Sequence, residues 1–119
     1  MTMKQIFQNL AIAEIATQSI STVATSFDVV NAEDLPIPAP GEFWVGVIFK
    51  EVGDVESDHE IVHVTAVSGN TLTVIREQEN SRARTFVAGD LIELRNTAGT
   101  LERLRDGMPE EITRYRETV

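Results

Sequence analysis

The chain has 119 residues, the size of one domain, and 42% of them are hydrophobic, which is enough for a single core. Nineteen acidic residues against ten basic ones give a net charge of −9. This balance argues against a nucleic-acid partner, because phosphate binding needs clustered lysine and arginine. The absence of cysteine excludes disulfides, thiolate catalysis and cysteine-based zinc sites.

Residues 1–19 are predicted to form an extended N-terminal arm. An apolar run follows Ile6, but three polar residues interrupt it, which is atypical of a secretory signal: Gln8, Asn9 and Glu14. Ile6 and Leu10 have helical spacing, whereas the residues after Leu10 alternate, so both helix and strand stay open here. We favour an extended arm that becomes a strand near Ile20–Val23. No apolar stretch approaches the ~20 residues of a membrane helix, and no membrane partner is expected.

A β domain is predicted over residues 20–98. Apolar or alternating runs bounded by turn residues predict strands at residues 26–30, 42–49, 59–67, 71–75 and 91–95. Gly69-Asn70 lies between two β-branched runs and predicts a hairpin turn, since both residues tolerate a positive φ. The segment from Arg76 to Val87 is predicted to be a long loop whose end returns to the core.

Side-chain alternation predicts the two faces of the strand at residues 59–67. One face would carry Ile61, His63, Thr65 and Val67, and the other Val62, Val64 and Ala66. The preceding loop has prolines at three alternate positions, which keep it extended and deny it ladder donors: Pro36, Pro38 and Pro40.

Residues 99–119 are predicted to be a C-terminal helical extension. Thr100 could cap a short helix that contains Leu101 and Leu104 and ends at Asp106-Gly107. A second helix could begin with Pro109 at its first position, with acids in its first turn and arginines in its last. Its apolar stripe would consist of Met108, Ile112 and Tyr115. A helix this short is marginal alone and must dock on its own domain or on a neighbour.

Charge is distributed unevenly along the chain. Every arginine except Arg76 lies in residues 81–119, where seven arginines balance seven acids, while the first eighty residues carry the whole net charge. Such blocks are typical of solvated surfaces, or of head-to-tail or ring contacts between copies, in which complementary charge sets the register. The second interpretation gives these candidate partner contacts: Met108, Ile112, Tyr115, Arg82, Arg84, Arg114 and Arg116.

No metal, cofactor or catalytic residue is expected. The acids from Glu51 to Glu60 do not follow the spacing of a calcium loop and more often form a solvated rim. His59 and His63 would lie roughly 13 Å apart on one strand, too far to share a metal, and a cross-strand polar partner is expected for His63. No nucleophile-elbow pattern occurs, and a chain this short leaves little room for a deep cleft.

Several turns recur in an order that resembles a small β-module of tailed-bacteriophage virion proteins. Residues 64–74 read Val-Thr-Ala-Val-Ser-Gly-Asn-Thr-Leu-Thr-Val, and residues 88–90 form an Ala-Gly-Asp turn before a Glu-Leu-Arg strand at 93–95. The resemblance runs from His59 to Leu104, and residues 26–30 and 38–47 are similar to the earlier portion of that module. Together these segments cover roughly three quarters of the chain.

The chain departs from this module in the loop after Arg76. Glu77 and Asn80 stand where the module has glycine, which reduces the freedom of the loop to adopt a positive φ. The loop could therefore have a different shape from that of the module, and a loop of different shape could bind a different partner. The resemblance implies a small β domain used in tail-fibre, baseplate or capsid-surface assembly, and it implies no catalytic residues.

Together these observations predict a mainly β protein: a small antiparallel β-barrel or β-sandwich with an extended N-terminal arm and a short C-terminal helical segment. We expect a non-enzymatic virion structural protein, assembled in the host cytoplasm, that connects tail-fibre or baseplate parts. Its partners would be other virion proteins and copies of itself, in a homo-oligomer such as a trimer or ring, without nucleic acid or membrane.

Three other functions stay open. A capsid decoration (cement) protein would use the same kind of module at another site of the virion. A carbohydrate-binding module would present Trp44 on its surface, although tryptophan within an apolar strand is usually core. A small hydrolase would use the acids around Glu56 and Asp58.

Overall fold

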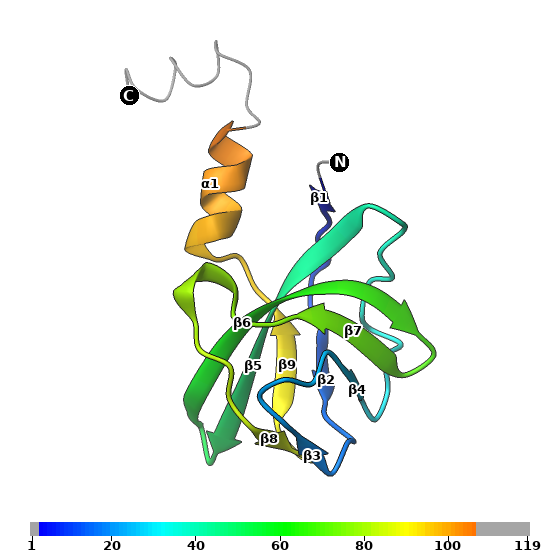
Figure 1. Cartoon of the computed structure of the whole chain (residues 1–119), viewed down its shortest axis with the longest axis vertical. Coiled ribbons are helices and arrows are strands. Elements are labelled where there is room, and N and C mark those ends of the chain that lie inside the picture. The colour runs from blue at the N-terminus through cyan, green and yellow to red at the C-terminus, as the bar shows by residue number, and fades with distance from the viewer. Residues whose placement is uncertain (1–2, 107–119) are drawn as a thin grey trace.

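The computed structural model describes residues 3–106 (Figure 1). It is mainly β with one short C-terminal helix, which confirms the predicted fold class. The elements in chain order are β1 (Lys4–Gln5), β2 (Ile12–Glu14), β3 (Ser19–Ile20), β4 (Ser26–Asp28), β5 (Glu42–Val52), β6 (Val55–Ser68), β7 (Thr71–Ile75), the 3-10 helix η1 (Gln78–Asn80), β8 (Phe86–Val87), β9 (Leu91–Leu94) and α1 (Ala98–Asp106).

Six strands form a curled antiparallel sheet in the order β2-β9-β5-β6-β7-β4, and β1 pairs with β5 in parallel. The two edges of this sheet meet in a bridge between Ile15 and Val29, so the half-barrel closes at one point. Strands β3 and β8 pair separately. Closure at the edges hides backbone groups that could otherwise pair with another chain.

The predicted hairpin at Gly69-Asn70 is confirmed, with β6 and β7 paired from Ser68 opposite Thr71. The predicted alternation along β6 is wrong at its end. The pairing of β6 with β7 shifts register between Val64 and Ala66, so Val67 joins Val62 and Val64 in the core. A β-bulge adds one residue to a strand and thereby reverses which face the following side chains occupy.

The centre of the barrel is built on β5. Trp44 and Ile48 point into the core cluster and are fully buried, and the Trp44 indole N–H donates to the carbonyl of Pro36 at 3.0 Å. Gly46 lies between them on the same face, where an added Cβ would meet Trp44 at 3.0 Å and Ile92 at 3.2 Å. The proline-rich loop thus packs against the core, and its Pro36 carbonyl accepts the hydrogen bond of the Trp44 indole N–H.

Within the predicted arm, residues 3–19 do not stand apart from the domain. Ile12–Glu14 pair with β9 as a strand of the main sheet, and Ala11, Ala13 and Ile15 are buried in the core. The predicted boundary at residue 19 therefore cuts through a continuous core. The expected strand near Ile20–Val23 is shorter and earlier, at Ser19–Ile20.

The helix α1 extends to Asp106, the last described residue, so the predicted break at Asp106-Gly107 lies at the limit of the described chain. Its cap lies three residues earlier than expected. Thr97 caps it, since the Thr97 carbonyl accepts from the Leu101 N–H at 3.0 Å and its hydroxyl from the Thr100 N–H at 3.3 Å. The expected cap, Thr100, is instead fully buried. Within residues 3–106, no helix has both the length and the apolar character needed to cross a membrane.

Candidate functional site

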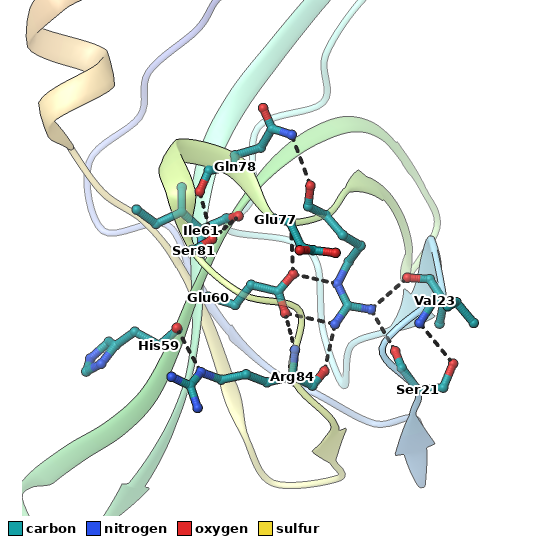
Figure 2. Close-up of polar contacts among 11 residues, drawn as sticks. Ser21, Val23, His59, Glu60, Ile61, Glu77, Gln78, Ser81 and Arg84 are labelled. Carbon is teal, nitrogen blue, oxygen red and sulfur yellow. Dashed lines mark hydrogen bonds and ion pairs between the residues drawn. The ribbon is translucent and has the colours of Figure 1, made fainter.

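A buried ion pair organises the loop between β7 and β8, which we call the 76–85 loop. The Glu60 carboxylate on β6 is fully buried and accepts from Arg76 Nε at 2.7 Å and Arg76 Nη2 at 2.8 Å. The same carboxylate accepts from the backbone N–H groups of Glu77 at 3.1 Å and Arg84 at 2.8 Å (Figure 2). Both ends of the loop are thereby held on one carboxylate.

The Arg76 guanidinium also binds three backbone carbonyls. Nη1 donates to Ser21 at 2.7 Å and Ala24 at 2.8 Å, and Nη2 donates to Arg84 at 2.7 Å. Arg76 therefore joins the segment after β3, strand β6 and the 76–85 loop. The planar guanidinium can satisfy all these acceptors at once, because its donors diverge in one plane.

Two opposing effects act on the pKa of Glu60. Burial raises it, whereas hydrogen bonds from Arg76 and from the Arg84 and Glu77 N–H groups lower it, and the net effect is a lowered pKa. The prediction that the acids from Glu51 to Glu60 form a solvated rim is therefore wrong for Glu60. Its partner, Arg76, directly follows β7, the strand that pairs with β6, and the spacing of the two residues in the sequence does not reveal the pair.

The backbone of the 76–85 loop has an unusual conformation. Glu77, Glu79 and Asn80 adopt φ values of 56°, 54° and 65°, in the left-handed region that favours glycine. Glu77 and Asn80, the two positions at which the sequence predicted less freedom for a positive φ, both adopt one. Asn tolerates this region, whereas Glu does so at a cost of about 1–2 kcal/mol.

Replacing Glu77 with glycine should raise the free energy of unfolding by about 0.5–1 kcal/mol, because relief of left-handed strain exceeds the entropy cost of glycine. Glu79→Gly is the matched control. It relieves the same strain but removes a carboxylate that binds α1, so it should give no gain. Urea unfolding followed by circular dichroism measures both. A loss of stability in Glu77→Gly would contradict this interpretation of the loop.

Glu79 connects the 76–85 loop to α1. Its carboxylate accepts from the Thr97 hydroxyl at 2.5 Å and from the Gly99 N–H at 2.8 Å, in the first turn of the helix. A carboxylate at this end complements the helix dipole. On the other side, Gln5 of β1 donates to Thr100 at 2.9 Å and accepts from Arg103 at 2.8 Å. These polar contacts orient α1 on the barrel.

Both histidines stack on phenylalanines of β5 on the outside of the barrel. His63 lies 4.4 Å from the Phe43 ring and His59 lies 5.8 Å from the Phe49 ring, each between ring centroids. Arg103 and Arg95 lie over the same two rings, at 5.3 Å and 4.5 Å. These contacts cover the outer face of β5.

The prediction of a cross-strand polar partner for His63 is wrong, because its neighbour is the Phe43 ring. Among the described residues, Nε2 of His63 is buried and has no hydrogen-bond partner. Burial and the nearby charge of Arg103 lower the pKa of His63, against a smaller opposing effect of Glu79. The neutral imidazole therefore packs beneath α1 as an aromatic ring.

The predicted contact residues are only partly within the described chain. Arg82 is exposed, and Arg84 donates to the His59 carbonyl at 3.2 Å and pairs with Asp58 at 3.5 Å. The two arginines therefore lie on the surface of the 76–85 loop. The other five lie outside residues 3–106: Met108, Ile112, Arg114, Tyr115 and Arg116.

Apolar side chains gather beside α1, where sequence reasoning proposed no site. A groove of about 460 Å³ is lined by Phe7, Leu10, Leu94 and Leu104 together with polar residues. An adjoining groove of about 310 Å³ shares Phe7 and Leu104 with it and extends to Met3. The signal in the sequence was the spacing of Leu101 and Leu104, but their exposure depends on how α1 is docked.

The structure offers little for metal or sugar chemistry in its described part. Residues 3–106 contain no group of three or more His, Cys, Asp or Glu side chains placed to hold a metal ion. Glu56 is exposed and pairs with Arg95 at 2.8 Å and His59 at 2.9 Å, which lower its pKa. Trp44 is fully buried, so it cannot stack on a sugar as the carbohydrate-binding alternative required.

Comparisons with known proteins give no further assignment. No protein-family model matches the chain, and no curated protein matches it either.

Proposed function

We propose that this chain is a non-enzymatic structural protein of a tailed-bacteriophage virion, which connects parts of the tail fibre or baseplate. The observation that carries the proposal is the 76–85 loop. Glu77 and Asn80 replace two glycines of the resembling module, yet both have the positive φ that glycine favours. The positive φ of Glu77, which a glutamate side chain disfavours, supports a loop geometry shared with the module.

The rest of the resemblance coincides with the ordered body of the domain. The segments that resemble the module include β4, the first part of β5, most of β6, all of β7, the 76–85 loop, β8, β9 and most of α1. The buried Glu60–Arg76 pair holds this loop rigidly between two strands, with Arg82 and Arg84 on its surface. A rigid loop that presents arginines suits the binding of another protein, since little order is lost on association.

The proposed partners are other virion proteins and further copies of the chain. The proposed contacts also include five residues that follow α1 in the sequence: Met108, Ile112, Tyr115, Arg114 and Arg116. A capsid decoration protein is the alternative within the same class, and it differs in location and copy number. The proposed location in both cases is the assembled virion.

Localisation of the chain in purified particles tests the proposal. An antibody against the chain, or mass spectrometry of particles that have been freed of lysate, should detect it in virions of the phage that encodes it. Cryo-electron microscopy should then place the barrel at the tail fibre or baseplate, whereas a site on the capsid surface would favour decoration. Absence from intact particles would contradict both virion functions.

A further inference from the structure

The helix α1 has its polar and apolar faces reversed with respect to its own domain. It turns Thr100 and Arg103 toward the barrel, where both bind Gln5. It leaves Leu101 66% exposed and Leu104 45% exposed. A surface helix of a globular protein normally buries its apolar face and exposes its polar face. Packing among residues 3–106 therefore does not explain the exposure of the two leucines.

The N-terminal segment adds to this apolar surface. It passes beside α1 (Figure 1) and contributes Met3, Phe7 and Leu10, of which Leu10 is 90% exposed. Leu10 also has a φ of 58°, which is costly for a leucine. We call Met3, Phe7, Leu10, Leu101 and Leu104 the α1 face. Phe7 and Leu104 lie in both grooves, so the grooves connect Met3, Phe7, Leu10 and Leu104. Leu101 lies one helical turn before Leu104 on α1.

The distribution of charge favours the α1 face as the surface through which two copies of the chain meet. Residues 3–10 contain one charged side chain, Lys4, and α1 contains two acids and two arginines, so this part of the chain is close to neutral. The whole chain carries a net charge of −9. Two copies that approach through their acidic surfaces repel each other, whereas contact through the α1 face keeps those surfaces apart.

We propose that the α1 face binds the α1 face of a second copy of this chain. The inference rests on the proposed assembly function and names the surface through which copies associate. Leu101 and Leu104 of one copy would enter the grooves beside Phe7 of the other. Contiguous apolar surface of this kind is uncommon on proteins that remain monomeric.

Sedimentation velocity of the full chain over a wide concentration range tests this proposal. The wild type should self-associate, and the double variant Leu101→Glu, Leu104→Glu should have a dissociation constant at least about 100-fold higher. Because both leucines are exposed in the single copy, the variant should keep its circular dichroism spectrum and melting temperature. The chain contains no cysteine, so a Leu104→Cys variant should form a covalent dimer on mild oxidation.

The matched control is Val52→Glu, Val55→Glu. These valines are 81% and 69% exposed at the β5–β6 turn, and the substitutions change the net charge equally. The control should associate like the wild type. A wild type that stays monomeric, whether residues 107–119 or another protein covers the face, would overturn the inference. Equal association of wild type and leucine variant would also overturn it.

The outcome is independent of the test of the proposed function. A monomeric chain that is present in virions would overturn the α1-face contact and leave the virion function standing. An oligomer that depends on Leu101 and Leu104 but is absent from virions would support the contact and overturn the virion function.

Discussion

Replacing Arg76 with methionine should lower the free energy of unfolding by about 3–5 kcal/mol, because it leaves the fully buried Glu60 carboxylate without its counter-charge. The substitution also frees the carbonyls of Ser21, Ala24 and Arg84, which Arg76 holds. Guanidinium chloride unfolding followed by Trp44 fluorescence measures the loss, since Trp44 is fully buried in the core.

Arg84→Met is the matched control for Arg76→Met. The Arg84 side chain is 44% exposed and pairs with Asp58 at 3.5 Å, so its loss should cost about 1 kcal/mol or less. The backbone N–H and carbonyl of Arg84 remain available to Glu60 and Arg76 in this variant. Equal losses in the two variants would show that the buried pair has no special part in stability.

The effect of Arg76→Met should depend on pH. In the wild type, the lowered pKa of Glu60 contributes stability that is present above the ordinary pKa of 4.5 and is lost as pH falls below it. Without Arg76, burial raises the pKa of Glu60, and protonation relieves the buried charge at low pH. The difference in stability between wild type and variant should therefore shrink on acidification. A constant difference would indicate lost packing and not an unpaired charge.

Gly46→Val should lower the free energy of unfolding by about 1–3 kcal/mol, because it overpacks the centre of the core. An added Cβ already meets Trp44 at 3.0 Å and Ile92 at 3.2 and 3.3 Å, and both side chains are fully buried. Gly46→Ala should cost less than Gly46→Val, since only the first carbon must be accommodated. Urea unfolding at neutral pH gives both values.

Thr73→Val is the control for Gly46→Val, since it places the same side chain on an exposed position of β7. This control should change stability by no more than about 0.5 kcal/mol. If Gly46→Val is as stable as the wild type, then the core at β5 has space that the structure does not show.

The loop and the α1 face differ in how much of each could be predicted. Arg76 and Glu77 were already singled out in the sequence, through the module that the loop resembles. The partner of Arg76 was not, because Glu60 looked like one of several alternating acids. Burial of one acid in such a row depends on which loop covers it, and no spacing rule encodes that.

For the α1 face too, the sequence predicted the local element but not which of its side chains are buried. Leu101 and Leu104 were predicted three residues apart on one short helix, and both lie in α1. Which side of the helix faces the barrel depends on Glu79 and Gln5, which lie 20 and 95 residues from the α1 groups they bind. The apolar stripe was therefore visible, but its exposure was not.

The sequence by itself determined the local structure, namely the Gly69-Asn70 hairpin and the main strands, because side-chain alternation and turn chemistry act over a few neighbouring residues. Only the tertiary structure decided that β2 joins β9, that Glu60 is buried with Arg76, and that α1 leaves its leucines exposed. Each of these depends on segments distant in the chain meeting in space, where burial and hydrogen bonding outweigh local preference.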